Sequence, residues 1–115
     1  MTILLRPWRV DDADDLSRAA PSAPDLAPQF GGTDLSDPDA ARDFIARFLR
    51  FDDSAKNWAV EVHGEAVGNV GATGIEFRHQ TAWMSYWLAA SARGKGIAVA
   101  ALARVSEWAF ASGLH

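Results

Sequence analysis

A basic glycine turn set between a strand and a helix constrains the fold of this chain more than any other feature. The turn is Arg93-Gly94-Lys95-Gly96; the aromatic-rich stretch 82–88 predicts a strand before it, and the stretch 97–111 predicts a helix that Gly113 ends. Two glycines let the backbone turn tightly, so that successive N–H groups point at one spot. The free N–H groups and the dipole of the following helix favour an anion there. Since Arg93 and Lys95 add whole charges, the turn predicts a site for a phosphate-bearing ligand.

Two common phosphate motifs do not fit this turn. A P-loop ends in Gly-Lys-Ser/Thr, whereas Lys95 is followed by Gly96 and Ile97. A dinucleotide-binding fingerprint needs Gly or Ala at its sixth position, which is Val99 here, and an acidic residue after a second strand. The sequence contains no such second strand after the turn, so both motifs are excluded.

The turn fits a third motif, which binds acyl-CoA. The segment from Ser85 to Ala98 closely resembles strand four, the pyrophosphate loop and helix three of the GNAT N-acetyltransferases, whose signature is Arg/Gln-x-x-Gly-x-Gly/Ala. The phrase Tyr86-Trp87-Leu88 is most similar to the RimJ/RimL-like subgroup, which acetylates ribosomal-protein N-termini. The resemblance implies acetyl-CoA as co-substrate, with its pantetheine arm on the backbone of the strand and its pyrophosphate in the turn. The cofactor residues implied in this way are Tyr86, Trp87, Leu88, Arg93, Gly94, Lys95, Gly96, Ile97, Ala98 and Val99. The side chains of Tyr86 and Trp87 are expected in the core.

The segments before the turn supply the order of elements. An apolar run at 3–6 predicts a strand, Asp11 is expected to cap a helix at 12–20, and Asp37-Pro38 predicts the start of a second helix. Strands are expected at 57–63 and 66–77, joined by a turn at Gly64-Glu65, and glycines within the second strand indicate bulges or bends. The same order opens a GNAT fold. The resemblance therefore implies an α+β (α/β) class with a mixed, mainly antiparallel sheet and flanking helices, in a single domain over residues 1–115.

Two segments bear on packing and on the acceptor. The second helix carries an apolar stripe that we expect to be core: Ala41, Phe44, Ile45, Phe48 and Leu49. The stretch 21–37 holds three prolines and two adjacent glycines, which predicts a long loop. In GNAT relatives this region covers the acceptor site. Phe30 is expected either to line that site or to hold the loop to the core.

The resemblance also implies an incomplete fold. A helix packed on a sheet normally returns as a parallel strand. In GNAT proteins that is strand five, splayed from strand four to form the cofactor slot, whereas here the sequence ends at His115. We therefore expect the N-terminal part of the fold, from strand one to helix three, with the 82–88 strand as an exposed edge open to a second copy or a partner chain.

The reaction implied by the resemblance is acetyl transfer from acetyl-CoA to a primary amine, on a protein N-terminus or a small molecule. Glu76, at the end of the third strand, could act as the base through water, and so could His79, whose ordinary pKa suits that task. An ordinary surface role is the alternative for both. Two other functions stay open: a non-catalytic acyl-CoA-binding module or half of an obligate assembly, and an unrelated α+β domain whose glycine turn only starts a helix.

Composition excludes several other classes of function. The net charge of −4 argues against nucleic-acid binding and is compatible with an amine substrate. The chain has no cysteine and its three histidines show no ligand spacing, so we expect no metal. The N-terminus lacks a long apolar run, so we expect no signal peptide, no membrane span and a cytoplasmic location.

Overall fold

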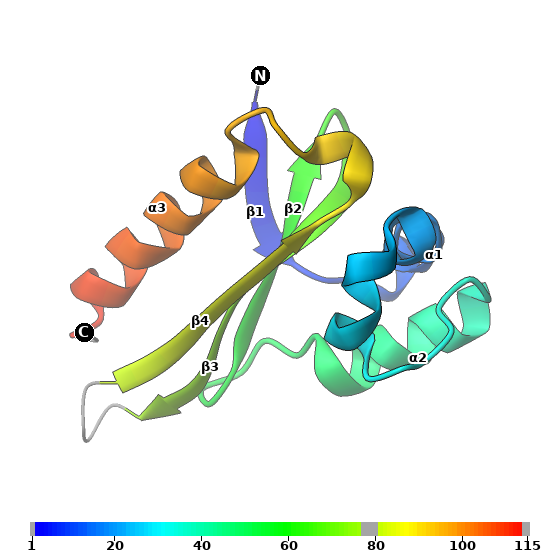
Figure 1. The fold of residues 1–115 in the computed structure, drawn as a ribbon. Helices are drawn as coiled ribbons and strands as arrows, with labels where there is room; N and C mark the ends of the chain where they lie inside the picture. The colour runs from blue at the N-terminus through cyan, green and yellow to red at the C-terminus, as the bar shows by residue number, and fades with distance from the viewer. Residues whose placement is uncertain (1, 77–80, 114–115) are drawn as a thin grey trace.

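The computed structural model describes residues 2–76 and 81–113, which form one antiparallel sheet with helices on both sides (Figure 1). The elements are β1 (Ile3–Pro7), α1 (Ala13–Ala19), α2 (Pro38–Phe48), β2 (Lys56–Val62), β3 (Glu65–Glu76), β4 (Thr81–Leu88) and α3 (Ile97–Ala111). Short 3-10 helices lie at Val10–Asp12, Ala20–Ser22, Pro24–Phe30 and Ala90–Ala92. The predicted order of strands and helices is confirmed, and α3 has the predicted bounds.

The sheet is a meander of order β1-β2-β3-β4 in which each strand pairs antiparallel with the next. Successive residues of a strand face opposite sides, so Ala59 and Trp87 enter one core while Val60 and Leu88 enter the other. The first core lies under α1 and α2, and the second lies under α3, as the placement of these helices in Figure 1 also shows. The predicted α+β class is confirmed.

Glycines shape β3 as predicted, although the turn before it differs. A Cβ at Gly68 would lie 2.4 Å from the carbonyl oxygen of Trp87, so only glycine lets β3 and β4 approach this closely. Gly74 has a φ of 58° and lies where the β3–β4 register shifts. The β2–β3 turn is formed by His63 and Gly64, with φ values of 53° and 79°, rather than by Gly64-Glu65. Positive φ at both central residues matches the twist of the strands.

The predicted cap of the first helix is wrong. Instead of an Asp11 cap, a 3-10 turn over Val10–Asp12 precedes α1, and the Asp12 carboxylate accepts the backbone N–H of Arg9 at 2.8 Å. The same carboxylate binds the guanidinium of Arg6 through two hydrogen bonds of 2.8 Å. Burial opposes ionisation of Asp12, but the bonds from Arg6 and Arg9 outweigh it and hold the pKa of this carboxyl below its ordinary value. The Asp12 carboxylate is therefore held by Arg6 and Arg9 just before α1 begins.

The second helix starts as predicted, and its apolar stripe is buried except at one residue. The Asp37 side chain accepts the N–H of Asp39 at 3.0 Å, which is the expected cap. The apolar stripe is buried with one exception: Phe48, the last helical residue, is 61% exposed. Its ring contacts Phe44 and otherwise faces the mouth of a cavity, because no element packs over the end of α2 there. The long 21–37 segment is also more ordered than expected, since most of it forms 3-10 turns.

Candidate functional site

The open edge of β4 and the start of α3 bound a cleft of about 470 Å³, which we call the edge cleft. Six of the ten residues predicted for the cofactor line it: Tyr86, Trp87, Leu88, Arg93, Gly94 and Ala98. The opposite wall comes from the 3-10 helix Pro24–Phe30, through Asp25, Leu26 and Gln29. Residues more than fifty positions apart in the sequence therefore meet in one cleft.

The backbone of β4 presents alternate residues to the open edge. Ala89 donates its N–H to the carbonyl of Val67 at 2.7 Å, which directs the backbone groups of Ala89 toward β3. In an antiparallel ladder successive residues point their N–H and C=O groups to opposite sides. The backbone groups of Tyr86 and Leu88 therefore face the cleft, while those of Trp87 face β3. The predicted backbone contacts with a cofactor are therefore limited to Tyr86 and Leu88. Trp87 lines the cleft with its ring.

The side chains of these two aromatic residues also differ. Tyr86 is 48% exposed, so the prediction that it belongs to the core is wrong. Trp87 is 5% exposed and confirmed as a core residue. The difference follows from the sheet: Trp87 points to the side covered by α1 and α2, whereas Tyr86 points to the opposite side and lines the edge cleft.

The glycine turn leaves several N–H groups available at the start of α3. Gly94 and Gly96 have φ values of 75° and 74°, the left-handed conformation that favours glycine. The first hydrogen bond of the helix runs from the N–H of Ala100 to the carbonyl of Gly96 at 3.1 Å. The N–H groups of residues 97–99 consequently have no acceptor within the helix, and they meet the positive end of its dipole. This is the arrangement expected for an anion site.

The two basic residues of the turn have different surroundings. Arg93 donates to both carboxylate oxygens of Asp25 at 3.0 and 3.1 Å, and its Nε contacts the carbonyl of Leu88 at 3.3 Å. The hydrogen bonds from Arg93 hold the pKa of the Asp25 carboxyl below its ordinary value. Lys95 is exposed, has no ion pair with another described residue, and lines a separate hollow with Ile97. Of the remaining predicted residues, Gly96 completes the turn and Val99 is 75% exposed on α3.

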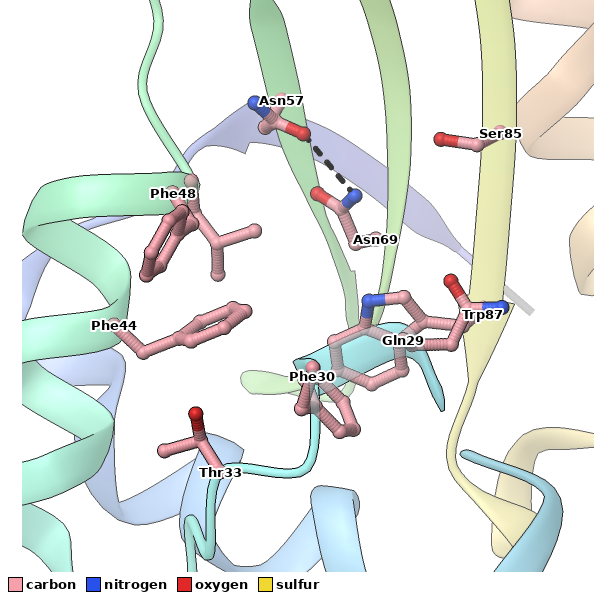
Figure 2. Close-up of a pocket in the computed structure, with 11 residues that line it drawn as sticks. Gln29, Phe30, Thr33, Phe44, Phe48, Asn57, Asn69, Ser85 and Trp87 are labelled. Carbon is pink, nitrogen blue, oxygen red and sulfur yellow. Dashed lines mark hydrogen bonds between the residues drawn. The ribbon is translucent and has the colours of Figure 1, made fainter. Parts of the chain in front are cut away.

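A second cavity of about 350 Å³ lies on the other side of the Trp87 ring, between α2 and β4 (Figure 2). We call it the inner cavity. It adjoins the edge cleft, because Gln29 and Trp87 line both. The other lining residues are Phe30, Gly31, Thr33, Phe44, Phe48, Leu49, Asn57, Asn69 and Ser85. Phe30 is 3% exposed, which confirms its predicted place in the core, and it also lines the inner cavity.

The aromatic wall of the inner cavity is a chain of rings in mutual contact. Phe30 meets Trp87 edge-on at 5.1 Å between ring centroids and meets Phe44 at 5.5 Å. Trp8 stacks on Trp87 at 6.2 Å, and Phe44 contacts Phe48 at 5.0 Å. These contacts fix the rings in place and cover much of their faces.

The opposite wall carries two buried amides that sequence reasoning missed. Trp8 Nε1 donates to Asn69 Oδ1 at 2.8 Å, Asn69 Nδ2 donates to Asn57 Oδ1 at 3.3 Å, and Asn57 Nδ2 donates to the carbonyl of Arg50 at 2.9 Å (Figure 2 shows the Asn69–Asn57 bond). Both asparagines are 5% exposed. A signal was present in the sequence for Asn69, since asparagine is depleted in strands and this one interrupts an apolar run.

Of the two predicted bases, the structure describes only Glu76. Glu76 ends β3 and is exposed; it lines neither the edge cleft nor the inner cavity. His79 lies outside the described residues. Among the described residues, no group of three histidine, aspartate or glutamate side chains could hold a metal ion. Within the same residues, none of the helices has the length and apolar character needed to cross a membrane.

Comparison with known proteins gives a family match. The model of the acetyltransferase (GNAT) domain matches residues 2–115. No curated protein sequence matches the chain.

Solved structures share the fold. A Mycobacterium smegmatis RimJ in complex with CoA-disulfide is 28% identical with a TM-score of 0.74, over 96% of this chain and 57% of that one. RimL, a ribosomal L7/L12 alpha-N-protein acetyltransferase in complex with coenzyme A, is 20% identical with a TM-score of 0.79, over 99% and 67%. A Vibrio cholerae spermidine N-acetyltransferase in complex with CoA and spermine is 17% identical with a TM-score of 0.72, over 95% and 64%. The chain thus spans from 57% to about two thirds of the length of these structures.

Proposed function

Because the chain belongs to the GNAT acetyltransferase family, we propose that it transfers the acetyl group of acetyl-CoA directly to a primary amine. The observation that carries this proposal is the junction at Gln29 and Trp87. There the edge cleft, which has the features of a CoA site, opens beside an inner cavity of a size suited to a small ligand. In this proposal the edge cleft takes acetyl-CoA and the inner cavity takes the amine.

The residues of the edge cleft fit the chemistry of CoA. The backbone N–H and C=O groups of Tyr86 and Leu88 would bind the amide groups of the pantetheine arm in the manner of an added strand. The N–H groups at the start of α3 would bind the pyrophosphate, with Lys95 adding charge. Substituents at Gly94 and Gly96 would meet no atom within 4 Å, so the space over the turn is open and only their positive φ demands glycine.

The reaction needs two proton movements and one exchange of bonds. The acceptor ammonium first loses a proton to a base, and the neutral nitrogen then attacks the thioester carbonyl carbon. The C–N bond forms, the C–S bond breaks, and the proton shed by the nitrogen passes to the leaving thiolate. Alignment of the two substrates across the Trp87 junction would supply much of the acceleration.

Glu76 is the proposed base, and it would take the proton of the acceptor ammonium through water. Its replacement, Glu76→Gln, is expected to lower turnover, with Glu65→Gln at the other end of β3 as the matched control. Unchanged turnover in Glu76→Gln would exclude Glu76 and leave the transfer itself intact.

A non-catalytic acyl-CoA-binding module, or half of an obligate assembly, is the second candidate. The β4 edge favours it, since Trp83 is 79% exposed on one face of this edge strand and Tyr86 is 48% exposed on the other, and a second copy or partner chain could pair there. We also propose that the matched region is a single GNAT domain and that it works in the cytoplasm, where acetyl-CoA would be its co-substrate.

The first test is calorimetric titration of the chain with acetyl-CoA, together with circular dichroism on the same sample. We expect micromolar binding by a folded chain, followed by amine-dependent release of free CoA thiol. Binding without thiol release over a panel of amines would favour the non-catalytic module. A folded chain that does not bind acetyl-CoA would contradict both candidates.

A further inference from the structure

We infer that a polar notch over Gly71, beside the inner cavity, holds the nitrogen of the acceptor amine, and that Asn57 and Ser85 accept its N–H groups. The inference rests on the proposed function, in which this cavity takes the acceptor, and it assigns two binding residues to that reaction. Three observations carry it: three polar atoms converge over Gly71, the direction of the Asn57 oxygen is fixed, and the Ser85 hydroxyl is available.

Gly71 leaves open the space where three polar side chains meet. It pairs with Asn57 of β2 on one side and with Ser85 of β4 on the other. A Cβ at Gly71 would lie 2.8 Å from Asn57 Oδ1, 3.4 Å from Ser85 Oγ and 3.5 Å from Asn69 Nδ2. All three polar residues line the inner cavity, and Figure 2 shows them together on one side of the sheet. We call this space the glycine notch, because any larger residue would place a side chain between these atoms.

The two ends of the amide relay fix the direction of the Asn57 oxygen. The indole N–H of Trp8 can only donate, so it must meet the oxygen of Asn69. The backbone carbonyl of Arg50 can only accept, so it must meet the nitrogen of Asn57. Asn69 Nδ2 then donates to Asn57 Oδ1 at 3.3 Å. Asn57 Oδ1 therefore lies toward the notch with one lone pair still available, since a carbonyl oxygen has two.

Ser85 supplies the second acceptor. Its hydroxyl makes no hydrogen bond with another described residue, and it lies across Gly71 from Asn57. A hydroxyl oxygen has two acceptor lone pairs and can rotate its own proton away from a ligand. Asn57 is 5% exposed whereas Ser85 is exposed, so the notch has one dry side and one side that a ligand can reach.

These groups fit the needs of the nucleophile. A primary amine keeps two N–H groups after it loses its proton. If it donates them to Asn57 Oδ1 and Ser85 Oγ, the lone pair stays free to attack the thioester carbonyl carbon. Asn69 Nδ2 is a donor, so it opposes an extra proton on the nitrogen and favours the neutral amine, which is the form that attacks.

The ring of Phe48 is the competing place for the nitrogen. Phe48 is 61% exposed and lines the inner cavity, and an open ring face attracts a cation. Such a ring would hold an ammonium through its charge, whatever the number of its N–H groups. The glycine notch instead needs N–H groups to donate. A tertiary amine of the same charge therefore distinguishes the two places.

The direct test follows the side-chain amide signals of Asn57 in two-dimensional ¹H–¹⁵N NMR spectra. The folded chain is titrated with benzylamine and with N,N-dimethylbenzylamine, in which two methyl groups replace two of the N–H groups. We expect benzylamine to shift these signals and to bind about tenfold more tightly, as loss of one or two hydrogen bonds predicts. Equal affinities, or tighter binding of the tertiary amine, would place the nitrogen on the Phe48 ring and overturn the inference.

Variants of the notch test the two acceptors. Gly71→Ala fills the notch and should weaken benzylamine binding about tenfold, with little effect on the tertiary amine. Ser85→Ala leaves the relay intact and should weaken benzylamine binding several-fold, and Ser85→Thr, which keeps a hydroxyl, should restore it. Thr73→Ala is the control, since Thr73 follows on the same face of β3 and lines neither site. Unchanged affinity in Ser85→Ala, or a loss that Ser85→Thr does not restore, would overturn the assignment of Ser85.

Failure of this inference can be separated from failure of the proposed function. A chain that acetylates benzylamine with the same KM and kcat in Ser85→Ala would keep the transferase and overturn the notch. A chain that acetylates no amine removes the transferase. The titration then decides by itself: weaker binding of the tertiary amine supports the notch as an amine site, and equal binding overturns it.

Discussion

The edge cleft and the inner cavity share the Trp87 ring, but they are built from different kinds of groups. The edge cleft is lined by β4 backbone, by the N–H groups of the glycine turn and by an exposed ion pair between Arg93 and Asp25. The inner cavity is lined by neutral, largely buried side chains ordered by the Trp8–Asn69–Asn57 relay. A site made of backbone tolerates changes of side chain, whereas a site made of side chains depends on each of them. Four substitutions test this difference.

Trp87→Ala removes the wall that both sites share, and we expect the largest effect from it. Truncation of a buried tryptophan costs about 3–5 kcal/mol of unfolding free energy. Acetyl-CoA and acceptor binding should both weaken, because the ring separates and aligns the two sites. Denaturant unfolding and calorimetry check this, and loss of one ligand alone would show that the sites are independent.

Gly96→Val should break the edge cleft and leave the inner cavity intact. A β-branched residue at a φ of 74° is strained, and the turn must move to relieve it. We expect acetyl-CoA binding to weaken by roughly a hundredfold, as for an oxyanion-type donor set that is displaced. Gly113→Val is the control, since Gly113 has a similar φ of 83° at the other end of α3. Equal losses in both variants would point to destabilisation instead.

Asn69→Leu should affect the inner cavity alone. It leaves the buried N–H of Trp8 without an acceptor, which costs about 1–3 kcal/mol of unfolding free energy. Binding of a small primary amine in the inner cavity should weaken about tenfold, while acetyl-CoA binding measured on the same sample stays unchanged. A matching loss of acetyl-CoA binding would show that the relay also supports the edge cleft.

Asp25→Asn should have the smallest effect, and in the opposite direction. The Asp25 carboxylate holds Arg93 in the apo chain and would repel a pyrophosphate, so its removal should tighten acetyl-CoA binding a few-fold. Asp34→Asn is a control at an exposed aspartate that lines neither site. Weaker binding in Asp25→Asn would indicate that the pair positions Arg93 for the ligand.

The same pair predicts a pH dependence. The pKa of Asp25 lies below its ordinary value, so the carboxylate stays charged and bound to Arg93 until the pH falls through that lowered pKa. Above the ordinary value, the contribution of Asp25 to acetyl-CoA affinity should not change with pH. The gain in acetyl-CoA affinity of Asp25→Asn over the unchanged chain should therefore shrink only below a pH of about 3.8.

Much of the architecture could be predicted from the sequence. The bounds of α3, the Asp37 cap of α2, the meander of strands and the glycine turn all depend on residues close together in the chain, whose backbone preferences act locally. The turn also predicted the edge cleft, because a cradle of N–H groups is a property of the backbone. The sequence by itself thus determined the elements and the site that they form with their own main chain.

Only the tertiary structure decided the rest. Asn69 reaches Trp8 across 61 positions, Arg93 reaches Asp25 across 68, and Asp12 gives up its expected place in a helix to bind Arg6. Phe48 is exposed although it belongs to the apolar stripe of α2. The periodicity of the sequence predicts the stripe, but it does not predict which part of the stripe is buried by other elements. Such contacts depend on how the layers stack and on the exact strand register, since one residue of slip would turn Asn57 and Asn69 to the opposite face.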